Sequence, residues 1–333
     1  MTSKPTLPPH GGALSERDVL RDEFATLGRF DTRYAAFIET LRSARPRLHR
    51  YCARMTGSVF DGEDVAQESI FEAYRKLDQY DATRPLAPWL FRIAHNRCID
   101  FVRSRNARLA TETAAAPSDE GYEPAPSLRR EIDLAFEHLV TRLPPKERAC
   151  VLLKDLFDHS LEETADIVAS TVGGVKSALK RGRTKLAAMP ASPEPGSPNR
   201  PPAIHARYVE LFNSRDWDGL RSLIRDDARL RISDVYAGAL RPEYFTTFLR
   251  MPHPFRMVPG AVDAEPVLML IGGHAEGALT AVVRLVLVEH RIAGVQHYAR
   301  CPWLLKAAGS VWMDGAPHAI DRPVPDAGTP ILA

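Results

Sequence analysis

Residues 160–189 read SLEETADIVASTVGGVKSALKRGRTKLAAM, and this pattern predicts two helices around a short break. The first helix is expected at about Leu161–Ala169, with acids in its opening turn, where negative charge suits the helix dipole. The second is expected to begin near Ser170 or Thr171, both good N-cap residues. On a helical wheel the second helix has one apolar side and an adjacent cationic side. The stretch therefore predicts a helix-turn-helix whose basic helix docks in the major groove of DNA.

The basic helix supplies the candidate contacts to duplex DNA. They are Lys176, Ser177, Lys180, Arg181 and Arg183. A solvated charged helix is the alternative for a lone basic helix. The preceding helix and the tight turn favour the DNA-binding interpretation.

A wider stretch, residues 141–186, resembles region 4 of the extracytoplasmic-function (ECF) sigma factors of RNA polymerase. The matching pieces are LPPKER at 143–148, LEETA at 161–165, GGVKS at 173–177 and RGRTKL at 181–186. The resemblance implies that the basic helix reads the −35 promoter element and that this domain meets the β flap of the polymerase. The family pattern usually has Thr at Gly174 and often Arg at Ala178, so two potential DNA contacts are absent here.

Composition sets broad limits on the class of protein. With 333 residues the chain has room for two or three domains, and its net charge of +2 means that nucleic acid must be bound by local basic patches. The four cysteines are widely spaced without a CxxC pair, which suits a reducing cytosol. His49 and Cys52 form an isolated HxxC that packing explains better than metal binding, so we expect no metal and no cofactor.

No apolar run approaches the ~18 residues of a membrane span, and the N-terminus is polar and proline-rich. We therefore expect a cytoplasmic protein without a membrane partner, beginning with a flexible segment over residues 1–25.

Residues 26–108 have a helical pattern with two contrasting faces. In the helix after residue 62, Asp64, Glu68 and Glu72 share an acidic face, for which solvation is the alternative reading. A later helix, expected at Trp89–Arg105, carries basic side chains, and Tyr80 and Trp89 lie in or beside the loop before it. Basic and aromatic groups together suit bases that are partly unstacked. The alternative is that Trp89 and its neighbour Phe91 belong to the core.

This part of the chain is similar to sigma region 2, through DGEDVAQE at 61–68 and PWLFRIAHNRCID at 88–100. The resemblance implies that the acidic helix binds the clamp helices of the polymerase β′ subunit, through Asp61, Glu63, Asp64, Gln67 and Glu68. It also implies that the loop and the basic helix melt and read the −10 element, through Tyr80, Trp89, Arg92, Asn96, Arg97 and Arg103. Capture of an unstacked strand in a cationic groove offsets the free energy of melting.

Two segments of biased composition separate three domains. Residues 109–128 are rich in Ala, Pro, Ser and acids and predict a linker. The second domain is then 129–189, opening with a helix at about 129–143. Residues 190–203 hold six prolines and predict a semi-rigid tether.

The third domain is expected at residues 204–306, followed by a tail over 307–333. Amphipathic helices come first, and strand-like runs follow at 228–235, 266–271, 279–288 and 291–299. YVELFNSRDW at 208–217 and QHYAR at 296–300 resemble SnoaL-like domains of the NTF2 superfamily. The predicted fold class is thus multidomain, with two all-α domains followed by an α+β NTF2-like cone.

Polar groups in the third domain are candidates for a pocket inside the cone. They are Asp234, Tyr236, His274, His297, Tyr298 and Arg300. No acid–base pair follows from their spacing, so we expect no catalysis, while a small-molecule ligand stays open. In ECF sigma factors with a SnoaL-like extension, the extension modulates activity in place of a separate anti-sigma protein.

The sequence predicts an ECF-type sigma factor that binds core RNA polymerase and promoter DNA. One alternative is a helix-turn-helix regulator that binds duplex DNA without polymerase, although such a regulator needs no strand-opening domain. The other is a sigma factor whose cone turns over a small metabolite, which paired groups with shifted pKa values in a pocket would favour.

Overall fold

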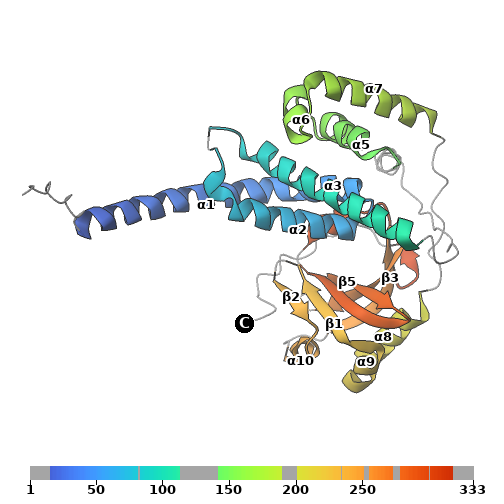
Figure 1. The fold of residues 1–333 in the computed structure, drawn as a ribbon. Helices are drawn as coiled ribbons and strands as arrows, with labels where there is room; N and C mark the ends of the chain where they lie inside the picture. The colour runs from blue at the N-terminus through green and yellow to red at the C-terminus, as the bar shows by residue number, and fades with distance from the viewer. Residues whose placement is uncertain are drawn as a thin grey trace, which may run out of the picture.

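The computed structural model describes residues 16–81, 83–112, 142–189, 201–233, 235–250, 255–272, 278–299 and 301–317. Two groups of helices are followed by a strand-rich part (Figure 1). This is the predicted fold class, in which all-α parts precede an α+β domain.

The first helical group consists of α1 (Glu16–Thr56), α2 (Val59–Arg75), a 3₁₀ turn at Leu77–Gln79 and α3 (Leu86–Glu112). Helix α1 begins at Glu16, inside the segment 1–25 that was predicted to be flexible, and that flexibility stays a prediction. Residues 16–32 contain no proline, and a helix that is already nucleated extends at little cost. Helices α1 and α2 pack so closely that a Cβ added at Gly62 would overlap the backbone of Ala53.

The second helical group consists of α5 (Pro145–Val151), a π-helical turn at Leu152–Leu156, α6 (Leu161–Ile167) and α7 (Val172–Ala188). Ser160 and Glu163 form a capping box on α6, and Thr171 caps α7 through the backbone N–H of Gly174. The predicted helix–break–helix is confirmed. Most of the helix expected at 129–143 lies outside the described residues.

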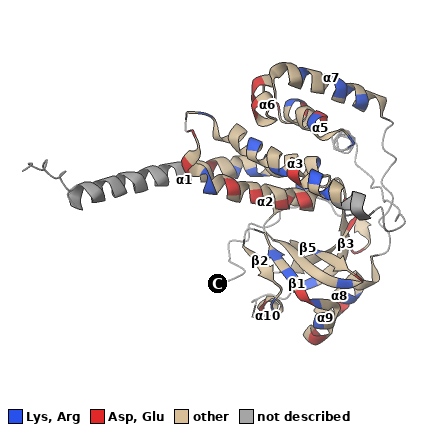
Figure 2. Cartoon of the chain, in the orientation of Figure 1, with Lys and Arg blue, Asp and Glu red and all other residues tan. Residues whose placement is uncertain are grey.

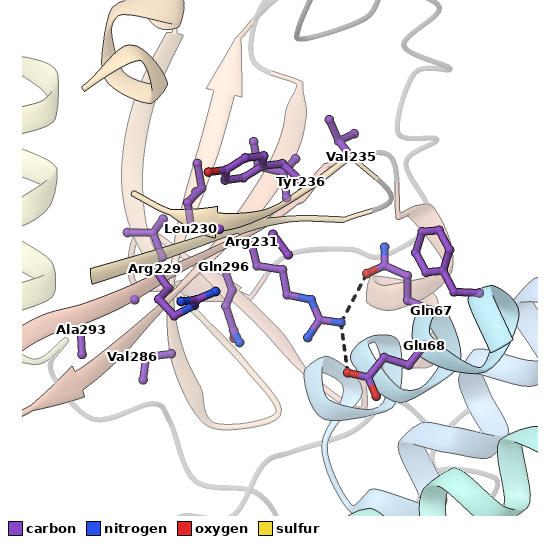
Figure 3. A pocket seen from close by; sticks show the side chains of 16 residues that line it. Gln67, Glu68, Arg229, Leu230, Arg231, Val235, Tyr236, Val286, Ala293 and Gln296 are labelled. Atoms are coloured by element: carbon purple, nitrogen blue, oxygen red, sulfur yellow. Dashed lines mark hydrogen bonds and ion pairs between the residues drawn. The ribbon is translucent and has the colours of Figure 1, made fainter. Parts of the chain in front are cut away.

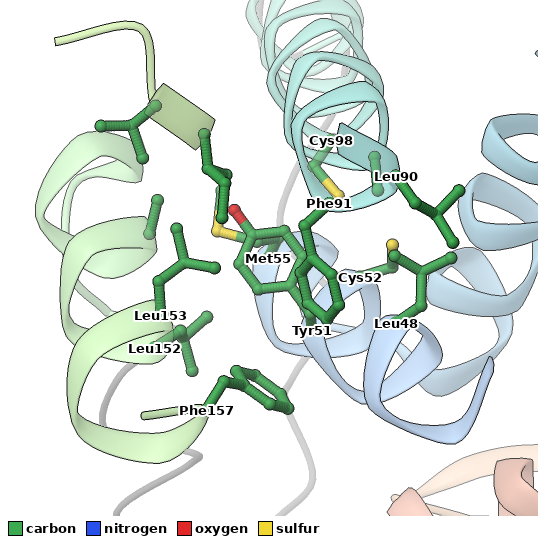
Figure 4. Close-up of a cluster of buried hydrophobic side chains, with 14 of the residues drawn as sticks. Leu48, Tyr51, Cys52, Met55, Leu90, Phe91, Cys98, Leu152, Leu153 and Phe157 are labelled. Atoms are coloured by element: carbon green, nitrogen blue, oxygen red, sulfur yellow. The ribbon is translucent and has the colours of Figure 1, made fainter. Parts of the chain in front are cut away.

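The two helical groups share one hydrophobic core (Figure 4). The ring of Phe157, after the π-helical turn, lies 6.1 Å from the ring of Tyr51 on α1 and 5.9 Å from that of Phe91 on α3. Arg148 on α5 donates through Nη1 to the carbonyl oxygen of Met55, at 2.6 Å. The helix-turn-helix is therefore packed against the first helical group.

The C-terminal part is an eight-stranded sheet of order β2-β1-β6-β5-β4-β3-β7-β8, with β1 and β6 parallel. Its strands are β1 (Ile224–Ile232), β2 (Tyr236–Ala239), β3 (Phe255–Val262), β4 (Glu265–Gly272), β5 (Leu279–Val288), β6 (Arg291–Ala299), β7 (Val311–Met313) and β8 (Ala316–Pro317). Its helices are α8 (Ala203–Asn213), α9 (Trp217–Leu223), α10 (Glu243–Arg250) and α11 (Pro302–Ala307). The prediction of a tail from residue 307 is wrong for 311–317, where the two strands are too short to produce a period.

The sheet has two covered faces. The inner face packs on α8, α9 and α10 around aromatic side chains such as Tyr208 and Phe248. The outer face packs on α11 and on the first helical group, where Phe60 of α2 lies with its ring 5.0 Å from that of Tyr298. The sheet is thus docked on α2 by an apolar core of its own.

Candidate functional site

The predicted polymerase-binding face of α2 lies against the outer face of the sheet. Arg284 Nη1 on β5 is 2.9 Å from Asp61 Oδ1, and Arg231 Nη1 on β1 is 3.0 Å from Asp64 Oδ2. Arg231, Gln296 and Arg284 form one cross-strand row, because Arg231 pairs with Gln296 and Gln296 pairs with Arg284 in the register of β1, β6 and β5. The sheet therefore presents two cations in line with two acids of one helix.

Other members of the predicted face also contact the C-terminal domain. Arg231 Nη2 lies 3.5 Å from Gln67 Oε1 and 4.0 Å from Glu68 Oε1 (Figure 3). Glu63 is fully buried, forms an ion pair with Arg45 of α1, and accepts a hydrogen bond of 2.7 Å from Trp303 Nε1 of α11. All five predicted residues thus lie in or beside this interdomain contact, with Glu63 as an internal anchor.

Burial changes the titration of this face. Burial raises the pKa of Asp64 to about 7, and the nearby charge of Arg231 only partly offsets that rise. The pKa of Glu265 on β4 is also raised by burial, against the opposing effect of Arg284. The ionised form of a carboxyl group in this contact is therefore less favourable than it is in water.

The first set of predicted DNA contacts gathers on α3 and the end of α2. Trp89, Arg92, Asn96 and Arg97 line a polar groove of about 590 Å³ together with Glu72, Lys76, Gln79, Ile93 and Asp100. Tyr80 packs on Trp89 at a ring distance of 5.0 Å, so it supports one wall. Arg103 lies outside this lining and is 3.8 Å from Asp100.

Charges in this groove are not equally available. Arg97 Nε is 2.5 Å from Glu72 Oε2. Arg92 and Asn96 are exposed, and within the described part of the chain their side chains make no hydrogen bond or ion pair. Two of the groove's polar groups are thus free to meet a ligand.

The second set lies on α7, where Figure 2 shows basic residues along the helix. Lys176, Ser177 and Lys180 are exposed, and no described residue pairs with their side chains. Arg181 is 2.8 Å from Glu147 of α5, and Arg183 is 2.6 Å from Asp155. The structure thus divides the predicted contacts into three free groups and two that are held by acids of the same helical group.

The described members of the predicted cone pocket do not all lie on one face of the sheet. Tyr236 and His297 both lie on the inner face, where His297 is buried with Nδ1 3.0 Å from the hydroxyl of Tyr244. Tyr298, next in the strand, points to the opposite face because side chains alternate, and its hydroxyl lies 3.4 Å from Asp64 Oδ1. Asp234, His274 and Arg300 lie outside the described residues.

Sequence reasoning missed the partners of the α2 face, which are Arg231, Arg284 and Trp303. Arginine at alternate strand positions indicates a polar outer face, but it does not say what that face meets. A usable signal exists for β5, where Arg284 is a single cation within an otherwise apolar run. Strand β1 carries three arginines and two aspartates, so its sequence does not single out Arg231.

Two family models match the helical parts of the chain. Sigma-70 region 2 matches residues 40–108, and Sigma-70 region 4 matches residues 133–186. The ECF RNA polymerase sigma factor SigW of Bacillus subtilis (strain 168) is 30% identical over 162 residues, which cover 45% of this chain and 87% of SigW. The chain belongs to the ECF RNA polymerase sigma factors.

Another similar protein is the ECF sigma factor SigG of Mycobacterium tuberculosis (strain ATCC 25618 / H37Rv). It is 30% identical to this sigma factor over 227 residues, which cover 60% of the chain here and 61% of SigG. Among solved structures, Mycobacterium tuberculosis SigJ is 16% identical with a TM-score of 0.31, over 81% of this chain and 98% of that one.

Two kinds of feature are absent among the described residues of the sigma factor. No helix among them combines the length and hydropathy that a membrane span needs. Nor do three or more His, Cys, Asp or Glu side chains gather there into a candidate metal site.

Proposed function

We propose that the chain is an alternative sigma factor of the ECF type whose C-terminal domain inhibits it. It binds core RNA polymerase through the acidic face of α2, directs the enzyme to −10 and −35 elements, and initiates transcription in the cytoplasm. Inhibition, as opposed to activation, is supported by the pairing of Asp61 and Asp64 with arginines of the sheet.

The covered face explains how inhibition would work. A carboxylate held by a guanidinium on one side is not available to a cation on the polymerase, so the two partners compete for the same groups. We call the arrangement in which the sheet covers α2 the closed form. The apolar contact of Phe60 with the outer sheet face further stabilises this form. The polymerase must therefore displace the sheet before it can bind α2.

The packing of the two helical groups supports a second requirement for opening. The −10 and −35 elements are about 25 base pairs apart, which is roughly 85 Å along straight DNA. Helix α3, with 27 residues, is only about 40 Å long, and the two helical groups share one core through Tyr51 and Phe157. We infer that this packed arrangement is too short to contact both elements of a straight promoter, so that α5–α7 separate from α1–α3 on DNA binding.

We assign the −10 element to the groove beside Trp89 and Arg92, and the −35 element to Lys176, Ser177 and Lys180. Arg97, Arg103, Arg181 and Arg183 would need to exchange their acidic partners for phosphate. The domains we propose are residues 26–108, 129–189 and 204–317.

The C-terminal domain is proposed as a regulatory module without enzymatic activity. Its inner face is filled by aromatic side chains, among them Tyr208, Tyr244 and Phe248. Burial lowers the pKa of His297 to about 4, which makes it a poor base near neutral pH. A catalytic cone stays the alternative, and turnover of a small metabolite by the full chain would establish it.

Run-off transcription with core polymerase tests the proposal, with the full chain compared against a chain ending at Met189. Discrete start sites from genomic promoter fragments are expected with both, and more transcript with the shorter chain. A shorter chain that is folded by circular dichroism yet less active than the full chain would overturn inhibition. Promoter binding without any polymerase-dependent transcript would favour the simple helix-turn-helix regulator.

A further inference from the structure

A groove of about 630 Å³ lies where α2 meets the outer face of the sheet, beside the Arg231 contact (Figure 3). One wall is formed by Gln67, Glu68 and Phe71 of α2. The other is formed by residues of β1, β2, β5 and β6. Its volume is that of a small-molecule site, and neither wall alone encloses it.

The floor of the groove is formed by glycine and by residues with small side chains. Val286, Gly294 and Arg229 lie in one cross-strand row on β5, β6 and β1. Gly294 lines the groove, and a Cβ added there would lie 3.3 Å from Val286 Cβ. Ala293 of β6 and Ala237 of β2 extend this floor of small residues.

Large apolar side chains border the groove and stay in contact with water. Phe71 is 54% exposed, Val235 is 52% exposed and Val286 is 38% exposed. They come from α2, from the turn just before β2 and from β5, so the apolar surface is present on both walls. Such a bordered patch is typical of a ligand groove.

A cation without a counter-charge lies at the groove. Arg229 is exposed, and within the described residues its side chain makes no hydrogen bond or ion pair. Arg231, two residues along the same strand and face, lies within 4.0 Å of both Asp64 and Glu68. Arg229 is thus the cation in this lining that can bind an added anion without breaking an ion pair.

We propose that the groove binds a small anionic amphiphile, an apolar chain ending in a carboxylate. The carboxylate pairs with Arg229, and the chain lies over Gly294 between Val286 and Phe71. A guanidinium recognises a carboxylate through paired hydrogen bonds, and the exposed apolar rim supplies the rest of the contact.

Binding there would hold the protein closed, an effect that rests on the proposed inhibition by the C-terminal domain. Phe71 belongs to α2, whereas Arg229 and Gly294 belong to the sheet, so a ligand that touches both needs the closed form. A ligand shifts an equilibrium toward the state that it binds better. The amphiphile therefore acts as a co-inhibitor that lowers affinity for core polymerase.

Titration calorimetry of sodium decanoate into the full chain, below its micellar concentration and without polymerase, tests the site. We expect saturable binding that Arg229→Ala weakens about tenfold or more, since a charge-assisted pair is lost. Phe71→Ser and Gly294→Val should weaken it similarly, one by removing a wall and the other by filling the floor. Arg221→Ala, an exposed arginine of α9, is the matched control and should bind as wild type does.

Absence of saturable binding, or unchanged binding by Arg229→Ala, would overturn the site. Loss of binding in Arg229→Ala with full binding in Phe71→Ser would overturn the bridging role. The proposed inhibition is judged separately by transcription from the full and shorter chains without decanoate. Decanoate that binds yet fails to lower affinity for core polymerase would refute the co-inhibitor role alone.

Discussion

Arg284 Nη1 lies 2.9 Å from Asp61 Oδ1 and joins residues 223 positions apart in the chain. Arg284 also pairs with Glu265 of β4, so one guanidinium links the sheet to α2. Both partners of the Asp61 pair are about one-fifth exposed, with side-chain exposures of 22% and 19%. Ion pairs in such positions fix orientation more than they add stability, because desolvation offsets the attraction. This pair and the Arg231 pair set how the sheet sits on α2.

Reversing one charge of the sheet should open the protein. Arg231→Glu replaces attraction to Asp64 and Glu68 by repulsion, a change of about 1–2 kcal/mol in the free energy of closure. We expect roughly 5–30-fold tighter binding to core polymerase, measured by fluorescence anisotropy. Arg229→Glu, on the same strand and face but without an acidic partner, is the control. Equal effects of the two substitutions would argue against the specific contact.

Closure should weaken as pH rises. In the closed form Asp64 faces Arg231, Arg284, Asp61, Glu63 and Tyr298, and burial raises its pKa to about 7. In the open form it is solvated with an ordinary, lower pKa, so the closed form binds the proton more tightly. Ionisation therefore penalises closure, and the penalty builds up as pH rises from the ordinary pKa of an aspartate to about 7 and levels off above it.

The closing equilibrium should fall about tenfold between about pH 6 and about pH 8. Energy transfer between dyes on α2 and the sheet measures it. Asp64→Asn should remove most of this dependence, and an unchanged pH profile in that variant would assign the effect to another group.

Free and paired groups of the −10 groove should differ in their contribution. Arg92→Ala and Asn96→Ala remove groups that have no partner among the described residues, so each should weaken binding of a single-stranded −10 oligonucleotide by about 3–10-fold. Arg97→Ala also leaves Glu72 without its closest cation, so part of its effect should appear as a lower melting temperature. Binding to that oligonucleotide that survives Arg92→Ala unchanged would place the −10 site elsewhere.

The salt dependence of −35 binding should distinguish α7 residues in the chain ending at Met189. Lys176→Ala and Lys180→Ala should each lower the slope of log affinity against log salt by about 1, because each removes one phosphate contact. Arg183→Ala should change the slope less, since Asp155 already holds that guanidinium. Identical slopes for Lys176→Ala and the unsubstituted chain would exclude this lysine from the DNA interface.

The crossing of α1 and α2 should tolerate no side chain at Gly62. Gly62→Ala forces a Cβ into the backbone of Ala53, and we expect the free energy of unfolding to fall by about 2 kcal/mol or more. Urea unfolding measures this. Gly173→Ala in the first turn of α7 is the control. The added Cβ would lie 3.9 Å from its nearest neighbour, Thr171 Oγ1, and alanine favours the helix. A Gly62→Ala protein as stable as wild type would mean that the helices can move apart.

Local signals were sufficient for much of the fold. The acids in the first turn of α6, the Thr171 cap and the apolar period of α7 lie within a few residues of one another, so the helix–break–helix could be predicted. Strands β5 and β6 were predicted with their observed bounds, because their apolar runs are continuous and separated by a short turn.

Other elements depend on contacts that a linear pattern does not contain. Strand β3 includes Pro259 and Gly260, which weaken a strand signal, yet a Cβ at Gly260 would lie 2.7 Å from the Trp312 carbonyl oxygen of the neighbouring β7. The candidate DNA contacts were found by residue type, but the pairing of Arg183 with Asp155 required the structure. The covered state of Asp64 likewise depends on a residue 167 positions away.

One polypeptide carries both the acidic face of α2 and the domain that covers it, connected through a segment with six prolines. An inhibitor on the same chain is always present at one copy per sigma factor, and its local concentration is set by the tether and not by synthesis. The fraction of open molecules is then independent of how much protein the cell makes. Output would rise in proportion to expression, without the threshold that titration by a separate inhibitor produces.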